Sequence, residues 1–521
     1  MTKIKPKKDT DENQDNRKIY YYRFQDRHTK SRLLLNNSNI DIGFSLNIQP
    51  STSSTRDLKS IENNELFLST TLSQFKSFKE FVSCIIQSDQ ISFSYFVISC
   101  SSLIQNLPKF QRFIKSNIVD LSTCSLSKYS GLPYPLTKPL QLLCQTSFWD
   151  NLISVYFQEF HPILPLFSIQ SFNSKTISHS LLSAMYFCAY QFSTNQPKEV
   201  SEYMEKLEKH NIKNILKNIT LDNIRTLVIH TAMAQWGGKM ELAKSLQSHL
   251  SRMSYLLGLH LDYGKLSPID RYNRNILFCI VRKVNIELSG SRNFTPNYLT
   301  ELGNNKARLY DPKWHLPSPH SPLYLNNPLE NQLYSLCLTQ FFKFNDISSK
   351  NMQFHLFYNK EASTFNSIWN SKVNAIKVLF EDAIGSLKQL KLIYKEFQQI
   401  IDPFEIRVRM AYHESMIKMY EVLKHKYKSL SSKDITNILE HCDHLHQEII
   451  ANSNNSIYSQ FFAHIVGLNY LSVYSKCTTF QKQTTKQRLH DLILYMNDRF
   501  VSNLSLNYLV LKTGFESLDE N

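Results

Sequence analysis

The sequence is poor in glycine. Only 11 of its 521 residues are glycine, about 2% against a usual share of about 7%. Phosphate-binding loops, dinucleotide-binding folds, β-propellers and hairpin-rich sandwiches all place glycine at strained turns. Helices avoid glycine, because it costs them roughly 1 kcal/mol relative to alanine. Runs with a period of two that close on Asn-Gly or Asp-Gly are also missing, so the sequence favours a helical protein.

The sequence also lacks closely spaced cysteines. The nearest two of its nine cysteines lie 16 positions apart, so no C-x-x-C pair occurs. Most stand among apolar residues, where a free cysteine behaves as a small hydrophobic group. The amino terminus, MTKIKPKKDT, does not have the pattern of a signal peptide, and a reduced intracellular compartment is expected. The most apolar run, residues 91–104, is too short to span a bilayer, so no membrane partner is expected.

Catalytic motifs are missing as well. His413-Glu414 is followed by Ile417 where a zinc-protease motif needs a second histidine. Gly237-Gly238-Lys239 lacks the first glycine of a phosphate loop, and no G-x-S-x-G occurs. No catalytic residue is therefore identified, and no cofactor-binding residue can be named. An enzyme with scattered catalytic groups stays as an alternative.

One stretch resembles a metal-binding cluster in composition: His441, Cys442, His444 and His446. On a helix, His441 and His444 face a different side from Cys442 and His446, so the four groups do not converge. We expect no metal site here and predict a polar helix surface instead.

Positive charge is in excess. The chain has 59 Lys and Arg against 44 Asp and Glu, a net charge of +15. This excess favours a polyanion such as nucleic acid as a partner, although an AT-rich genome would produce the same diffuse composition. Residues 1–65 resemble a disordered, basic and Ser-rich tail. Within it Lys3, Lys5, Lys7 and Lys8 form either a nuclear import or phosphate-binding cluster or merely a solvated chain end.

Apolar periodicity predicts helices along the rest of the chain. Residues 66–144 are predicted to form accessory helices, with Leu72, Phe75, Phe78 and Phe81 as core positions. A stripe that ends at Leu257 predicts a helix that Gly258 terminates. A Pro-rich stretch, residues 308–328, predicts a surface crossover between two helical halves, residues 145–310 and 330–521. Further helices are expected at 404–428, 433–451, 457–477 and 485–513.

A heptad seam runs through the second half. Its apolar positions alternate in steps of four and three: Ile376, Phe380, Ala383, Leu387, Leu390, Tyr394, Phe397 and Ile401. As one helix the seam would be about 39 Å long at about 1.5 Å per residue. It predicts either a long core helix of a bundle or a coiled coil that joins two copies of the chain.

Two ordered blocks carry a resemblance. Residues 148–167 read FWDNLISVYFQEFHPILPLF, an apolar helix face followed by His-Pro and a second proline that turn the chain. Residues 251–262 read SRMSYLLGLHLD, and DRYNR follows at 270–274. In this order and spacing the blocks resemble the fungal-specific transcription factor domain, or middle homology region, of the zinc binuclear cluster transcription factors. The matching positions, taken as structural, are Tyr156, Phe157, His161, Pro162, Pro165, Arg252, Met253, Leu257, Gly258, Leu259, His260, Arg271, Arg274 and Gly290.

The resemblance has departures. The Trp-Trp pair of the family's Arg-rich helix is replaced here by Ile276, Leu277 and Phe278, and Arg282-Lys283 stands near its Asp-Arg. The six-cysteine zinc cluster that precedes the domain in full-length members has no counterpart. Either the gene model is truncated, or the regulator works without its own cluster.

Several expectations follow from the resemblance. The fold is all-α, a large irregular multi-helix bundle with a disordered basic N-terminal tail. The protein regulates RNA polymerase II transcription in the nucleus, and its partners are the transcriptional machinery or co-regulators. DNA is reached through a missing module or a partner, and the chain needs no cofactor beyond zinc in a missing N-terminal cluster. The alternative is a helical scaffold that does not bind DNA, or a protein that forms a homodimer through the seam.

Overall fold

The computed structural model describes residues 79, 82–83, 139–193, 196–237, 239–261, 264–289, 309–352, 361–427, 430–451, 457–498 and 506–519. All of them lie in one unit, residues 75–521. In these ranges every regular element is helical, which confirms the all-α expectation. No helix in them is long and apolar enough to cross a membrane. The predicted tail, its lysines Lys3, Lys5, Lys7 and Lys8, the stripe at residues 72–81 and Gly290 lie outside the described residues.

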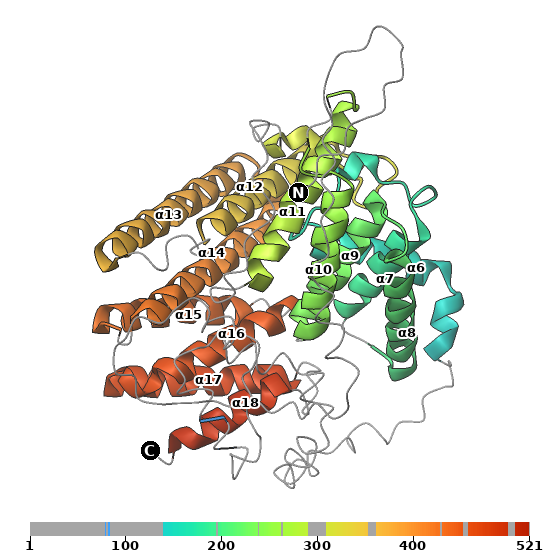
Figure 1. The fold of residues 1–521 in the computed structure, drawn as a ribbon. Helices are drawn as coiled ribbons and strands as arrows, with labels where there is room; N and C mark the ends of the chain where they lie inside the picture. Colours follow the sequence, from blue (N-terminus) through green and yellow to red (C-terminus); the bar gives the residue numbers. More distant parts are fainter. Residues whose placement is uncertain are drawn as a thin grey trace, which may run out of the picture. The chain divides into compact units, whose positions relative to one another are not determined.

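Helices up to residue 289 pack around α9 (Figure 1). The α-helices of this part are α6 (Thr146–Val155), α7 (His179–Gln191), α8 (Lys198–Ile215), α9 (Leu221–Trp236), α10 (Met240–Leu256) and α11 (Pro268–Ser289). Short turns lie between them: η5 (Pro139–Cys144), the π-helical η6 (Tyr156–Phe160) and η7 (Ile169–Ser171). Side chains from every turn of α9 between Ile224 and Trp236 are buried, because other helices pack around it.

The end of α10 shows how a local sequence signal fixes a boundary. Gly258 has φ of 65°, the left-handed conformation in which glycine is favoured. The Leu259 N–H donates to Ser254 O at 3.0 Å, and the Gly258 N–H donates to Tyr255 O at 2.9 Å. This pair of bonds is a Schellman motif, and Leu259 beyond it is fully buried. The predicted termination by Gly258 is confirmed.

The Pro-rich segment after residue 308 is only in part the surface crossover that the sequence predicted, because Tyr324 and Leu325 are exposed while its beginning is buried. Leu309 and His315 are buried, and η9 (Pro312–His315) packs against α12. The ring of Trp314 stacks on Tyr272 of α11 at 5.0 Å. Proline excludes a long helix here but does not require exposure, because the segment's backbone groups find partners in neighbouring elements.

The helices after the crossover lie largely side by side (Figure 1). They are α12 (Pro328–Asn351), α13 (Ala362–Ile393), α14 (Gln398–Lys426), α15 (Ser432–Ala451), α16 (Ile457–Val473), α17 (Thr479–Asp498) and α18 (Leu506–Glu516). Short 3-10 turns are η10 (Lys395–Phe397), η11 (Tyr474–Lys476) and η12 (Ser517–Asp519). Asn327 caps α12 by accepting from the Leu329 N–H at 3.0 Å, and Pro328 takes the first helical position.

The heptad seam does not form one helix, so that prediction was wrong. α13 ends at Ile393, Tyr394 leaves the helical conformation with φ of −117° and ψ of 62°, and α14 starts at Gln398. The chain reverses, and α13 and α14 pack together as a helical hairpin. Ile376 and Leu387 on α13 and Ile401 on α14 are buried within the chain, as the core-helix alternative requires.

One other helix boundary was wrong. The helix expected at 485–513 is two helices, α17 and α18, whose connection at residues 499–505 lies outside the described residues. α14 begins six residues before the expected 404, while α15 agrees with 433–451 within one residue. The division into halves at 310 and 330 stays a prediction, although α11 contacts α12 and α9 contacts α16 across it.

Candidate functional site

The first motif block folds into a buried aromatic turn. The π-helical turn η6 closes with the His161 N–H donating to Tyr156 O at 2.9 Å. Tyr156 and Phe157 are fully buried, and Pro162 and Pro165 are buried where the helix ends. The block therefore supplies a fixed hydrophobic corner, as its apolar face and prolines indicated.

His161 lies inside this corner as a neutral ring. Its centroid is 5.2 Å from that of Phe157 and 5.3 Å from that of Phe167. Burial, with a smaller contribution from His315, lowers the pKa of His161 to about 3. Neither ring nitrogen has a hydrogen-bond partner among the described residues. The imidazole is thus a packing group at neutral pH, without the partner that a general base or a metal ligand needs.

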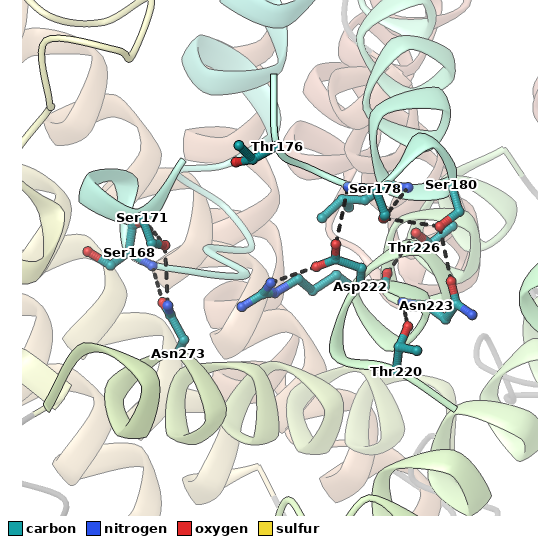
Figure 2. A network of polar contacts seen from close by, with 12 residues as sticks. Ser168, Ser171, Thr176, Ser178, Ser180, Thr220, Asp222, Asn223, Thr226 and Asn273 are labelled. Carbon is teal, nitrogen blue, oxygen red and sulfur yellow. Dashed lines mark hydrogen bonds and ion pairs between the residues drawn. The ribbon is translucent and has the colours of Figure 1, made fainter. Parts of the chain in front are cut away.

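The loop after the corner is tied to α11 and to the crossover (Figure 2). The Ser168 N–H donates to Asn273 Oδ1 at 2.7 Å, and Asn273 Nδ2 donates to Ser171 Oγ at 3.2 Å. The Ser168 hydroxyl donates to Trp314 O at 2.6 Å. Two side chains therefore connect segments that are more than 100 residues apart in the sequence.

A second part of the same network holds the start of α7 against α9 (Figure 2). Asp222 accepts from the Ser178 N–H at 3.3 Å and from Arg225 Nη1 at 2.8 Å. The Arg225 guanidinium lies 5.4 Å from the centre of the Phe167 ring. Burial lowers the pKa of Arg225, while Asp222 acts in the opposite direction. The carboxylate is occupied by these donors and presents no free catalytic group.

The second motif block forms the end of α10 and its contact with α11. Arg274 Nη2 donates to Leu257 O at 2.8 Å and to Gly258 O at 3.1 Å. These carbonyls belong to the helix end, where backbone acceptors lack partners within the helix. Arg271 Nη2 donates in the same way to Gly264 O at 2.8 Å. Both arginines of the motif thus stabilise the turn between the helices.

The remaining positions of the second block divide by exposure. Met253 and Leu259 are buried, whereas Arg252 is exposed. His260 packs beside Tyr255 with 4.9 Å between ring centroids, and burial lowers its pKa. These contacts describe a structural motif, and their functional role stays a prediction.

The residues of α11 that depart from the family's motif lie in the core. Ile276, Leu277 and Phe278 are buried where the resemblance led to tryptophans. Beyond them, Arg282 Nη2 lies 3.6 Å from Asp346 Oδ1 of α12, with both side chains almost inaccessible. The carboxylate of Asp346 also accepts from the Tyr310 hydroxyl at 2.7 Å and pairs with Lys350. This buried cluster joins the two sequence halves.

A narrow crevice lies beside that cluster. It is lined by α9, α11, α12, α14 and α16, and its charged side chains include Lys283, Glu287, Glu414 and Lys418. Its volume of about 20 Å³ leaves room for about one water molecule. The crevice is therefore a polar contact between helices and is too small for an organic ligand.

The histidine-rich stretch of α15 divides as expected, but it is not a polar surface. His441 and His444 face His413 of α14: His413 Nδ1 is 3.0 Å from His441 Nδ1, and the His413 and His444 rings stack at 4.8 Å. Cys442 lies near the charges of Glu421 on α14 and Arg488 on α17, and His446 lies near Asp491 on α17. His441, Cys442 and His446 are buried, because α14, α16 and α17 all pack against this helix.

The described residues of the motif blocks do not form an arrangement of catalytic or metal-binding groups. Among the described ranges, no three His, Cys, Asp or Glu side chains are placed to hold a metal ion. The sequence did not reveal Asp222, Asn273 or Asp346. The only local signal was the helix cap at Thr220, whose hydroxyl accepts from the Asn223 N–H at 3.1 Å and thereby marks the start of α9.

Comparison with known families agrees with the geometry. Residues 153–281 match the family described as the fungal specific transcription factor domain. This segment runs from the aromatic turn through most of α11, and the resemblance of the two motif blocks is confirmed. The family is a transcription-regulator domain and not an enzyme family. Searches of curated proteins and of solved structures found no match.

Proposed function

We propose that the protein is a fungal transcription regulator that acts on RNA polymerase II transcription in the nucleus, because residues 153–281 match the fungal specific transcription factor domain. The domain match is the observation that supports this proposal. The geometry is compatible with it, since the two motif blocks build a buried aromatic corner and the turn between α10 and α11. In this proposal the helices after residue 328 present surfaces to co-regulators or to the transcriptional machinery.

DNA reading is assigned to a separate module. The 521 residues contain no C-x-x-C pair. A binuclear zinc cluster holds its zinc ions with such pairs, and the module that it forms enters the major groove. We therefore propose that sequence-specific contacts and zinc belong to a partner or to chain outside these residues. The four lysines near the amino terminus would add only contacts to phosphate.

The DNA proposal has a direct test. Purified chain should bind duplex DNA weakly, without sequence preference, and with log K falling against log salt with a slope of about −4 or shallower if four lysines meet phosphates. Replacement of Lys3, Lys5, Lys7 and Lys8 by alanine should abolish that binding. Tight binding to one sequence by this chain alone would contradict the assignment.

The transcriptional proposal is tested by rapid depletion of the full-length tagged protein in its own cells. Nascent RNA should change first at promoters where the tagged chain is crosslinked to chromatin. A protein that stays outside the nucleus, with nascent RNA unchanged after depletion, would contradict the proposal. The scaffold alternative loses part of its support, because four of the eight seam positions are buried within the chain: Ile376, Ala383, Leu387 and Ile401.

A further inference from the structure

A cleft opens where three helix ends meet in the second half of the chain. Its volume is about 240 Å³, roughly eight times the share of about 30 Å³ that one water takes in the liquid. Asn366, Trp369 and Asn370 line it from the first turns of α13. Leu423 from the last turn of α14, Tyr427 and Asp434 from the first turn of α15 complete the wall.

The aromatic walls of the cleft are fixed by hydrogen bonds. Trp369 Nε1 donates to Met419 O at 2.9 Å, and its ring meets Tyr420 edge-on at 5.4 Å. The Tyr427 hydroxyl donates to Asn366 Oδ1 at 2.8 Å. A ligand therefore meets walls that are already ordered, which lowers the entropic cost of binding.

Asp434 is the charged side chain in this lining. One carboxylate oxygen, Oδ2, accepts from the Ser431 hydroxyl at 2.5 Å and from the Ser431 N–H at 3.2 Å, which caps α15. The other oxygen, Oδ1, accepts from no described residue. The described residues thus hold the carboxylate through Oδ2 and give Oδ1 no donor.

The carboxylate of Asp434 favours a cation over an anion. The helix ends do not decide the matter, because Leu423 brings the negative carboxyl end of α14 to the cleft while α13 and α15 bring their positive amino ends. Lys426 is directed onto the Phe365 ring, 5.4 Å from its centre, and does not line the cleft. The net charge of +15 belongs to the whole chain, and salt screens distant charges beyond about 8 Å. Among the described lining residues, Asp434 therefore carries the charge that a ligand meets.

We propose that this cleft binds a small organic cation, a primary ammonium on a short apolar chain. The ammonium donates to Asp434 Oδ1, the apolar chain lies against Trp369 and Tyr427, and the carboxamide of Asn370 supplies a further acceptor. Aromatic rings add to the attraction for a cation beside them. The claim that the cleft binds a cation depends on the geometry of the cleft alone. The further claim that this binding affects transcription rests on the proposed function.

The first test uses three probes of equal length and different charge. Isothermal titration calorimetry of the full chain with n-butylammonium chloride, n-butanol and sodium butyrate should show binding of the cation alone, with a dissociation constant in the millimolar range expected for so few atoms. Equal binding of butyrate, or no heat from butylammonium at tens of millimolar, overturns the proposal.

Two variants locate the site. Asp434→Asn keeps an acceptor for the Ser431 cap and removes the charge, so it should weaken butylammonium binding roughly tenfold or more. Asn370→Lys places an ammonium in the cleft from an exposed helix position and should abolish binding. If butylammonium binds both variants as it binds the unmodified chain, the site is not this cleft.

A matched control exists in the first half of the chain. Ser267 and Asp270 cap α11 as Ser431 and Asp434 cap α15, with Ser267 Oγ donating to Asp270 Oδ2 at 2.6 Å. Asp270→Asn removes the same charge from the same motif away from the cleft and should leave the affinity for butylammonium unchanged. A tenfold loss in this control as well would overturn the assignment, because general charge and not the cleft would then determine binding.

The two proposals fail in different ways. Binding is measured on purified protein without any readout of transcription, so a negative titration leaves the regulatory proposal intact. A positive titration combined with unchanged nascent RNA on depletion would retain the site and reject the regulator role.

Discussion

Residues 146–289 and residues 328–516 are both helical, yet different contacts hold them together. In the first region, single polar side chains connect distant loops and helices, as when Asn273 binds Ser168 across 105 positions. In the second, neighbouring helices pair through rings and ions. Phe380 stacks on Tyr412 at 4.0 Å, and Lys391 Nζ lies 2.6 Å from Asp402 Oδ1. The comparison teaches that helix content alone does not show which contacts a region depends on.

The largest expected effect comes from the cluster that joins the two regions. Asp346→Ala leaves Arg282 buried without its carboxylate, and loss of one member of a buried pair costs about 3–5 kcal/mol of unfolding free energy. Urea denaturation monitored by circular dichroism measures it. The exposed pair Lys343–Asp382, at 3.4 Å, is the control, and Asp382→Ala should cost less than about 1 kcal/mol. Equal effects of the two changes would show that the buried cluster is not the junction.

Asn273→Ala should have the next largest effect, because it leaves the buried Ser168 N–H without an acceptor. The expected loss is about 1–3 kcal/mol of unfolding free energy. In the second region, Asn437 donates to the Tyr420 hydroxyl at 2.8 Å from a half-buried position. Asn437→Ala should cost about 1 kcal/mol or less, since water can replace the lost bond. A larger loss for Asn437→Ala would reverse the comparison between the regions.

Acidification should distinguish the buried His161 of the first region from the buried His315 of η9. Folded His161 takes up a proton only near pH 3, whereas the unfolded chain does so near pH 6.5. The unfolded state binds more protons between these values, so the stability present above pH 6.5 is lost as the pH falls toward 3. At pH 5 the difference in His161 protonation should therefore lower the free energy of unfolding by an amount on the order of 2 kcal/mol.

The stability lost between pH 7 and pH 5 is measured as the difference between the urea midpoints at the two pH values. His161→Phe should make this difference smaller, because the share due to His161 is removed. Its nitrogens have no partners among the described residues, so stability at pH 7 should change little. His315→Phe is the contrasting variant, because it removes the partner of the Tyr272 hydroxyl, 3.1 Å away. It should destabilise the protein at pH 7 as well. Unchanged pH dependence in His161→Phe would contradict a buried neutral ring at this position.

The smallest pair of effects concerns two glycines. Gly258→Ala forces alanine into a left-handed conformation and should cost about 1–2 kcal/mol. Gly385 lies inside α13 with nothing within 4 Å of an added Cβ, so Gly385→Ala should stabilise the protein by about 0.5–1 kcal/mol. Thermal unfolding of both variants measures the contrast. Shifts of the same sign would show that the conformation of Gly258 does not contribute.

The sequence predicted local features well and long-range ones poorly. Gly258 was identified because a glycine after an apolar stripe determines a helix end within a few residues. The reversal at Tyr394 was missed, since the stripe from Ile376 to Ile401 can be buried by one straight helix or by two antiparallel ones. Neither glycine nor proline stands between Ile393 and Gln398 to mark the turn.

The candidate site divides in the same way. His161 and Arg274 were named from the resemblance, and the structure places His161 in the aromatic corner and Arg274 at the turn between α10 and α11. Asn273 belongs to the DRYNR segment, of which only the arginines were singled out, and Asp346 was not named, because a polar residue in a helical pattern resembles a surface position. Their partners, Ser168 and Arg282, lie 105 and 64 positions away in the sequence. Periodicity contains no information about such pairs.

Transcriptional activity of the tethered chain is the most direct test of the regulator role. The full chain is fused to a DNA-binding domain of known specificity, in a fungal cell that carries a reporter gene with the matching sites. The reporter transcript should rise or fall severalfold relative to the DNA-binding domain alone, and Asp346→Ala should abolish the change. A reporter that does not respond to the folded, nuclear fusion would contradict the assignment of these helices to transcriptional regulation.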